Sequence, residues 1–345
     1  GPFYTPNGKA NFVAITPRLP EQQTCAEYPF VLNTGRVRDQ WHTMTRTGNA
    51  PRLLKHVDRP WLSIHPQDAE VLQVSDGELI KAQAACAGDI EVILPVKIDS
   101  KQRRGEVFAP FHWSATWGSH ARVGALLNGV NDALSGQPEL KHGAIKLSPV
   151  KMQSYGIIFG EESLVQRLQK AAYYYLKMPT PVAQSIEVAD PRMPQDMLSD
   201  ILPCLPRDAQ WATKQGPEQL SVVVTHKEKL ILAVLINHQP NDIPRDWLDA
   251  LYSEELLTAA QINGLLEQQP DEEFRLGKVV CSCFGVRENT IRQAISDGTN
   301  TVTELGKALQ CGTNCGSCKT ELASLIASTP VAAQQNEETT NEYAL

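Results

Sequence analysis

Short apolar runs broken by turn residues fill residues 26–150 of this chain. One run, Phe30-Val31-Leu32, ends at Asn33-Thr34-Gly35, and later runs follow Asp76-Gly77 and Gly88-Asp89. Between them, Pro66 stands where a short helix can begin. Many short strands joined by Gly and Asp turns are typical of a barrel or a sandwich. We therefore predict a mostly β domain over residues 26–150, preceded by a proline-rich lead-in over residues 1–25.

The pattern changes after residue 150. Residues 161–177 have helical spacing, with Leu164, Leu168 and Tyr175 on one side, and Pro179 ends that run. A stretch rich in Pro, Asp and Met continues to about residue 216 and is typical of a linker. Two apolar runs, 221–224 and 230–236, then predict a hairpin, and residues 246–266 predict a helix. We expect a helix and linker over 151–216 and a small α+β segment of unknown role over 217–278.

The last part of the chain divides into a cysteine-containing module and a tail. Two short helices are expected at 288–295 and at 303–309, with Gly298 ending the first, so residues 279–327 are predicted to be a small all-α domain. Residues 328–345 are rich in Gln, Glu, Thr and Asn, a composition typical of a disordered acidic tail.

Composition narrows the class of protein. Hydrophobic residues make up 42% and charged residues 21% of the 345 residues, as in an ordinary globular protein. The net charge of −7 does not favour nucleic acid as a partner of the whole chain. No apolar run approaches the ~20 residues that a membrane span needs. The chain opens at Gly1-Pro2 without an initiator Met, so we expect a C-terminal fragment of a longer protein.

Five of the eight cysteines fall between positions 281 and 318. Cys281 and Cys283 form a CxC pair, 31 residues follow, and Cys315 and Cys318 form a CxxC pair. Four thiolates are the ligand set of a [2Fe–2S] cluster, and clustered cysteines favour a reducing compartment such as the cytoplasm. Structural zinc, whose paired cysteines are usually two to four residues apart, and buried free thiols are the alternatives. Cys311 is interpreted as a thiol beside the cluster, with a ligand exchange as the alternative.

A basic segment stands out in this acidic chain. Residues 36–59 contain six basic side chains against two acidic ones, a net charge of +4. A strand end followed by Gly, hydroxyl side chains and Arg can cradle a diphosphate. The alternative is a solvated basic surface loop.

Two resemblances add to these interpretations. Residues 279–327 resemble the bacterioferritin-associated ferredoxin family, in Val280-Cys281-Ser282-Cys283-Phe284-Gly285 and in the glycine-rich run from Cys311 to Cys318. The resemblance implies a helix–turn–helix [2Fe–2S] module that transfers electrons, with Cys281, Cys283, Cys315 and Cys318 as ligands. This module also occurs in assimilatory nitrate and nitrite reductases and in iron–sulfur scaffold proteins.

Residues 26–148 resemble the last domain of the molybdopterin oxidoreductases. The resemblance rests on Thr34-Gly35-Arg36-Val37, Trp41-His42-Thr43, the run from His65 to Ala69, and the stretch from Asn131 to Lys141. It implies a double-psi β-barrel that closes over a pterin guanine dinucleotide. The implied cofactor contacts are Thr34, Gly35, Arg36, Trp41, His42, Thr43, Asn128 and Lys141. Residues 108–113 would lie near the substrate funnel, with His112 either lining a channel or forming a satisfied surface histidine.

Together the resemblances imply the C-terminal part of a bacterial assimilatory nitrate reductase, in which residues 1–25 end the preceding catalytic domain. The chain would then be multidomain: a double-psi β-barrel, a mixed α+β linker region and a small [2Fe–2S] domain. Nitrate would be reduced to nitrite with bis-molybdopterin guanine dinucleotide, molybdenum and electrons from a reductase subunit, ferredoxin or flavodoxin. A [4Fe–4S] cluster and the protein ligand to molybdenum would lie outside this sequence, so no catalytic residue is predicted. Another molybdenum enzyme, such as a formate dehydrogenase, and a non-enzymatic electron-transfer or scaffold protein remain the alternatives.

Overall fold

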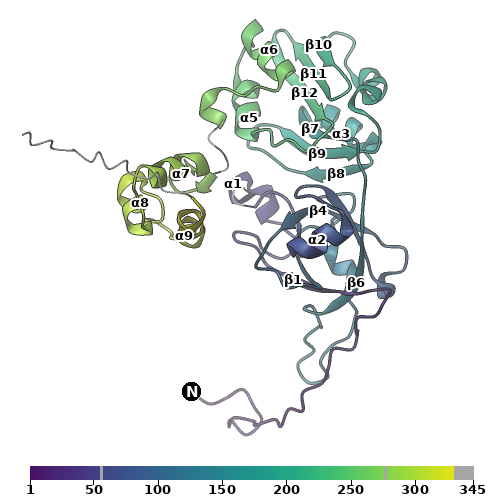
Figure 1. The fold of residues 1–345 in the computed structure, drawn as a ribbon, viewed down its shortest axis with the longest axis vertical. Helices are drawn as coiled ribbons and strands as arrows, with labels where there is room; N and C mark the ends of the chain where they lie inside the picture. Colours follow the sequence, from purple (N-terminus) through teal and green to yellow (C-terminus); the bar gives the residue numbers. More distant parts are fainter. Residues whose placement is uncertain (55–56, 276, 278, 330–345) are drawn as a thin grey trace, which may run out of the picture.

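The computed structural model describes residues 1–54, 57–275, 277 and 279–329. An extended N-terminal arm leads into a closed barrel, which is followed by a sheet covered by helices and by a helical module (Figure 1). The chain is therefore multidomain and mostly β, with a closed six-stranded barrel, as predicted. In the described part of the chain, no helix has both the length and the apolar character needed to cross a membrane.

Six short strands form the barrel, in the spatial order β1-β5-β2-β4-β3-β6. Two pairs are parallel, β1 with β5 and β2 with β4, and β6 pairs with both β1 and β3 to close the ring. Alternate residues of each strand point inward and fill the interior, among them Leu32, Ile64 and Val107. The strands are β1 (Phe30–Gly35), β2 (Leu62–Ile64), β3 (Leu79–Gln83), β4 (Val92–Ile98), β5 (Glu106–Pro110) and β6 (Gly143–Pro149).

Short helices and 3-10 turns connect the barrel strands. They are η1 (Thr47–Asn49), α1 (Pro51–Leu54), α2 (Pro66–Leu72), η2 (Ala85–Ala87) and η3 (Val123–Leu126). The structure confirms the helix predicted at Pro66, which is α2. The side chain of His65 caps this helix by accepting a hydrogen bond from the Gln67 amide. Asp68 in its first turn accepts a hydrogen bond from the Gly105 amide at 2.7 Å, which joins this helix to the start of β5.

The middle unit is one antiparallel sheet in the order β10-β11-β12-β7-β9-β8. Its strands are β7 (Ser154–Gly160), β8 (Tyr174–Lys177), β9 (Gln184–Asp190), β10 (Gln210–Gln215), β11 (Gln219–His226) and β12 (Lys229–Asn237). Val222, Val224 and Leu232 pack on one face, against α3 (Glu162–Ala171) and α4 (Leu198–Ile201). Val223 and Leu235 point to the other face, against α5 (Arg245–Ser253) and α6 (Ala259–Glu267). Burial of both faces explains why β11 and β12 are continuous apolar runs.

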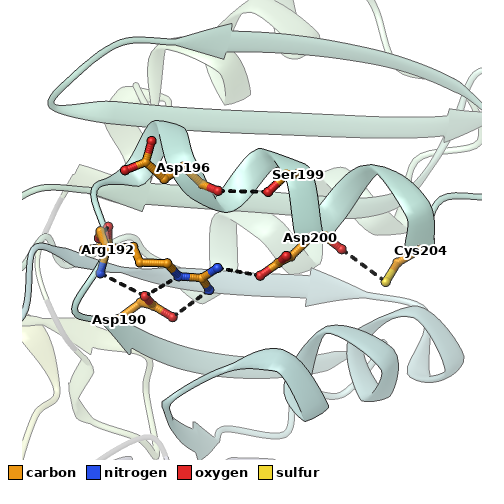
Figure 2. Close-up of polar contacts among 7 residues, drawn as sticks. Asp190, Arg192, Asp196, Ser199, Asp200 and Cys204 are labelled. Atoms are coloured by element: carbon orange, nitrogen blue, oxygen red, sulfur yellow. Dashed lines mark hydrogen bonds and ion pairs between the residues drawn. The ribbon is translucent and has the colours of Figure 1, made fainter.

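This sheet corrects the expectation of a linker. Strand β7 pairs with β9 from the stretch predicted to be a helix and linker, and with β12 from the stretch predicted to be a separate segment. Residues 191–204 are held by side-chain bonds as well as by η4 (Pro194–Met197) and η5 (Leu202–Cys204). Arg192 donates two hydrogen bonds to the buried carboxylate of Asp190 and one, at 2.7 Å, to Asp200 on α4 (Figure 2). A stretch of turn residues can therefore be ordered by contacts that its composition does not show.

Two predicted helices are shorter than expected. The helix expected over 161–177 ends at Ala171, and β8 follows, since Tyr174 and Leu176 alternate into the buried face while Tyr175 does not. The helix expected over 246–266 is two helices, α5 and α6. They are separated because Thr258 starts α6 with a capping box: the Thr258 side chain accepts a hydrogen bond from the Gln261 amide, and the Gln261 side chain accepts one from the Thr258 amide.

The C-terminal module is not all-α as predicted, because a two-stranded ribbon stands beside its three helices. These are β13 (Val279–Cys281), β14 (Val286–Arg287), α7 (Glu288–Ser296), α8 (Val302–Leu309) and α9 (Lys319–Ser328), with η6 (Glu272–Arg275) before them. The first two helices confirm the predicted ones, and α9 was not predicted. The core of the module is formed by Ile291, Leu305 and Leu322, one from each helix. Of the tail predicted over 328–345, Ser328 belongs to α9 and residues 330–345 lie outside the described residues.

Apolar contacts and ion pairs join the barrel to the middle unit. Trp117 and Met44 from barrel loops share one buried cluster with Tyr174 and Leu176 of β8. Beside it, Arg59 pairs with Glu187 of β9 at 3.1 Å, and Arg245 of α5 pairs with Asp58. Burial by itself would raise the pKa of Asp58, but Arg245 and Arg59 hold that pKa well below its usual range. The two units therefore pack as neighbours through an extensive contact.

Candidate dinucleotide and cluster sites

The residues after β1 form a tightly curved loop, residues 36–44, which we call the β1 loop. Asp39, His42 and Met44 have φ angles of 68°, 45° and 61°, in the left-handed region that non-glycine residues seldom adopt. Such angles persist only where surrounding contacts determine them. The shape of this loop must therefore be fixed by the rest of the barrel.

His112, which follows β5, supplies the main contact. Its Nε2 atom accepts a hydrogen bond from the Val37 amide at 3.0 Å, and its Nδ1 atom lies 2.6 Å from the His42 carbonyl oxygen. Since Nε2 is an acceptor, Nδ1 must carry the proton and donate it to His42. The side chain is fully buried, with a relative exposure of 0%. The neutral imidazole thus joins both ends of the β1 loop.

Burial also lowers the pKa of His112, and the nearby charge of Arg36 lowers it further, against the opposing effect of the hydrogen bond to His42. The neutral ring is therefore favoured near neutral pH. This arrangement corrects the expectation for His112, which neither lines a channel nor lies on the surface.

Two further side chains hold the loop. The indole Nε1 of Trp117 donates to the Thr43 carbonyl at 3.1 Å, and Gln40 Nε2 donates to the Leu53 carbonyl at 3.1 Å. A Cβ atom at Gly48 would lie 2.2 Å from Trp117 Cζ2, so only glycine permits this approach. Trp117 was missed at the level of sequence because its partners are 74 and 69 residues away along the chain.

The predicted contacts on the β1 loop face solvent. Arg36, Trp41, His42 and Thr43 are exposed, and the Arg36 guanidinium carbon lies 5.1 Å from the centre of the Trp41 ring. Trp41 is 55% exposed, and it meets His42 edge-on at 4.7 Å between ring centroids. A stacked guanidinium keeps its N–H donors available for phosphate, and an exposed indole face can stack on a base.

Thr34 and Lys141 are brought together across the barrel end. The Thr34 hydroxyl donates to the Leu140 carbonyl at 2.7 Å, and Lys141 Nζ donates to the Thr34 carbonyl. Gly35 faces Phe108, whose ring carbon would lie 2.6 Å from a Cβ atom there. Asn128 follows η3 and is half-buried. The structure therefore pairs Thr34 with Lys141 and Arg36 with Trp41, and it leaves Asn128 on a separate loop.

Two buried polar atoms lie close to this surface and bear on whether it fits a polar ligand. Gln40 Oε1 and His142 Nε2 have no hydrogen-bond partner within the described part of the chain. Each belongs to a residue next to a predicted contact, Trp41 or Lys141. Buried polar atoms are normally paired, so unused acceptors and donors at these positions fit a polar ligand. Cavities of about 320 and 360 Å³ lie at the unit junctions instead, and Arg36, Trp41 and Lys141 line neither of them.

In the C-terminal module the four predicted ligands meet as two pairs of thiols. Cys283 Sγ lies 3.4 Å from Cys315 Sγ, and Cys281 shares a hydrogen bond with Cys318. Cys281 and Cys318 are buried, while Cys315 is exposed. Among the described residues, no three His, Cys, Asp or Glu side chains converge around one point as ligands of a single ion would. Four cysteine thiolates are the number of ligands that a [2Fe–2S] cluster takes.

Hydrogen bonds and burial separate the pKa values of these thiols. The Ser317 hydroxyl and amide lower the pKa of Cys315 to about 7, whereas burial raises the pKa of Cys318 to about 11. Cys311 is fully buried, its thiol donates to the Leu305 carbonyl at 3.5 Å, and burial raises its pKa. Cys311 therefore packs in the module core behind the two pairs.

Comparison with known proteins matches both domains to known families. Residues 30–144 match the molybdopterin dinucleotide-binding domain family, and residues 279–328 match the BFD-like [2Fe–2S] binding domain family. A nitrate reductase of Klebsiella oxytoca is 32% identical over 93% of this chain, and one of Shewanella frigidimarina is 24% identical over 93%. An F420-dependent formate dehydrogenase alpha subunit of Methanocaldococcus jannaschii is 30% identical over 43% of the chain and 21% of its own length.

The chain spans 36% and 37% of the two nitrate reductases, or about a third of each. Its barrel is similar to the molybdopterin dinucleotide-binding domain family, its C-terminal module is similar to the BFD-like [2Fe–2S] binding domain family, and 93% of the chain is similar to a nitrate reductase.

Proposed function

We propose that this chain is the dinucleotide-binding and [2Fe–2S] portion of a molybdenum-dependent assimilatory nitrate reductase, a C-terminal portion of the catalytic subunit. One observation carries the proposal. A closed barrel with an exposed Arg–Trp pair precedes a module with two thiol pairs in one chain, and 93% of that chain is similar in sequence to a nitrate reductase. The same order of domains gives the chain a cofactor-binding part and a part that receives electrons.

In this proposal residues 26–150 are the dinucleotide-binding domain and form a double-psi β-barrel, which the parallel pairs β1–β5 and β2–β4 support. Arg36 pairs with a phosphate of the dinucleotide, and Trp41 offers a face on which a base stacks. Lys141 binds the dinucleotide with the N–H donors that are not bonded to the Thr34 carbonyl. Thr34 and Gly35 shape the loop through their backbone. The other assigned contacts are His42, Thr43 and Asn128.

Residues 279–327 are then the [2Fe–2S] domain, a helix–turn–helix built from α7 and α8 and supported by α9. Cys281, Cys283, Cys315 and Cys318 hold the cluster, and Cys311 packs behind it. The Ser317 hydroxyl, 3.1 Å from Cys315 Sγ, supplies a donor to a ligand sulfur. Such donors tune the reduction potential of a cluster.

Bis-molybdopterin guanine dinucleotide supplies molybdenum for oxygen transfer, and a [4Fe–4S] cluster belongs to a further part of the enzyme. Nitrate is the substrate, and nitrite and water are formed with two electrons and two protons. The electron donor is a reductase subunit, ferredoxin or flavodoxin, and the enzyme is cytoplasmic. Residues 1–25 belong to the end of the catalytic domain.

One alternative has specific support. The similarity to the formate dehydrogenase alpha subunit covers 43% of the chain, so the barrel by itself is compatible with another molybdenum enzyme. The similarity over 93% of the chain favours nitrate reductase. A cluster scaffold is a weaker alternative, because it gives no role to the Arg36–Trp41 pair.

The test uses the complete enzyme that contains this chain, purified anaerobically and analysed for molybdenum and iron. Nitrate-dependent oxidation of reduced viologen and formate-dependent reduction of the oxidised dye are measured on the same preparation. The proposal requires the first activity and not the second. A loaded enzyme that oxidises formate and leaves nitrate unchanged contradicts it.

A further inference from the structure

The cluster end of the C-terminal module touches the β1 loop of the barrel. Arg38 Nη1 donates a hydrogen bond to the Ser317 carbonyl at 2.6 Å, and Arg38 Nη2 lies 3.4 Å from Glu321 Oε2. Ser317 stands between Cys315 and Cys318, and Glu321 is in the first turn of α9. A single side chain therefore bridges the proposed cluster ligands and the proposed dinucleotide contacts.

Arg38 is held in place for this contact. It belongs to the β1 loop, which His112 and Trp117 fix from inside the barrel, and its Nε atom lies 3.7 Å from Asp39 Oδ2. The side chain is 25% exposed and that of Glu321 is 31% exposed. A charge-assisted bond from a half-buried guanidinium to a carbonyl is stronger than an exposed ion pair alone. This contact is therefore more than a screened surface pair.

A second arginine holds the two-stranded ribbon of the module. Arg287 of β14 donates to Asp246 of α5 at 2.6 Å and to the Gly277 carbonyl at 3.1 Å. The module lies beside the barrel, while α5 belongs to the middle unit (Figure 1). The two arginines thus act on different parts of the module: Arg287 on the ribbon that contains Cys281, and Arg38 on the loop of Cys315 and Cys318.

We propose that Arg38 docks the cluster end of the [2Fe–2S] module on the β1 loop, so that the four thiols and the dinucleotide contacts share one interface. Arg38 is a positioning residue that acts through Ser317 and Glu321. It is two residues from Arg36, which is assigned to phosphate. The naming of the two bound groups rests on the proposed function, whereas the docking rests on the contacts alone.

Hydrogen exchange tests the docking in the 345-residue chain with its cluster loaded. We expect Arg38→Ala to speed amide exchange of residues 315–322 about tenfold, because a charged hydrogen bond of this kind is lost. Arg38→Lys, which keeps the charge but not the two-point contact, should lie between. Arg103→Ala is the matched control, since Arg103 is 83% exposed on another barrel loop. Unchanged exchange in β4 verifies that each variant is folded.

A second readout is the reduction potential of the cluster, which should fall in Arg38→Ala because a positive charge leaves its surroundings. Adding Glu321→Gln to Arg38→Ala should speed amide exchange little further, since both changes remove the same Arg38–Glu321 contact. If exchange and potential in Arg38→Ala match those of Arg103→Ala, the docking is wrong. Neither readout requires nitrate reduction, so an enzyme that docks but does not reduce nitrate contradicts only the proposed function.

Discussion

The imidazole of His112 donates to the carbonyl of His42, 70 residues earlier in the chain, across 2.6 Å. With the Val37 amide as donor to its other nitrogen, this bond holds a loop that contains three left-handed non-glycine residues. The loop carries half of the proposed dinucleotide contacts. The neutral state of one buried histidine thus controls the shape of the candidate site.

The β1 loop should therefore loosen in acid. The pKa of His112 is lowered in the folded chain, so the unfolded chain takes up the proton first, and the stabilisation present above about pH 6.5 is lost as the pH falls. Amide exchange of residues 36–44, corrected for intrinsic rates, should rise between pH 7 and pH 5. His112→Gln should cost about 1–3 kcal/mol locally at pH 7 and flatten this dependence. His226→Gln, at a half-buried position of the middle unit, should leave it unchanged. Equal pH slopes for both variants and the parent would refute the role of His112.

Gly35 should not tolerate a side chain. A Cβ atom would lie 2.6 Å from the Phe108 ring, so Gly35→Ala should destabilise the barrel by about 1–3 kcal/mol through overpacking. Gly124→Ala is the control, because nothing lies within 4 Å of its Cβ position. Thermal unfolding of both variants measures the difference. Equal melting temperatures would show that Phe108 moves aside at no cost.

Local patterns predicted several barrel strands and the CxC and CxxC motifs, because both depend on residues close in the sequence. The thiol pairs of the structure, Cys283 with Cys315 and Cys281 with Cys318, join one motif to the other and were not predicted. The helix at Pro66 depends only on His65 and its neighbours in the sequence. The spacing of the CxC and CxxC motifs is enough to predict cluster ligands. The β11–β12 hairpin was predicted, but the rest of the middle sheet was missed, because paired residues of β7 and β12 lie 72 to 82 positions apart and the bonds of Arg192 are invisible to composition. Likewise, His112 and Arg38 act on partners 70 and 279 residues away, which periodicity cannot report.

Loss of any proposed ligand should remove the cluster. Purified anaerobically, the chain should be brown and hold about two irons, and Cys281→Ser, Cys283→Ser, Cys315→Ser or Cys318→Ser should each abolish the colour. Cys311→Ser should retain most of it, because that thiol bonds to the Leu305 carbonyl inside the core. Iron and zinc analysis with absorption spectra measures this. Zinc in freshly isolated protein would reject the cluster assignment.

Dinucleotide retention should depend on the β1 loop. In the complete enzyme, Arg36→Ala should lower molybdenum and pterin content several-fold, because a charge-assisted phosphate contact of about 1.5–3 kcal/mol is lost. Lys141→Ala should have a smaller effect, since part of the amine's hydrogen bonding goes to the Thr34 carbonyl. Arg167→Ala, on the exposed side of α3, is the control. Full cofactor content in both the Arg36 and the Lys141 variant would show that neither residue contacts the dinucleotide.

The central claim is that electrons reach the molybdenum site through the C-terminal module. Its most direct measurement is a paired assay of the complete enzyme with and without residues 279–345, at confirmed molybdenum content. Nitrate reduction is followed with reduced ferredoxin or flavodoxin and, separately, with reduced viologen, a small dye that can reach inner centres. We predict that the truncated enzyme loses activity with the protein donor and keeps most of its activity with the dye. Loss of both activities from a fully loaded enzyme, or retention of both, would contradict the claim.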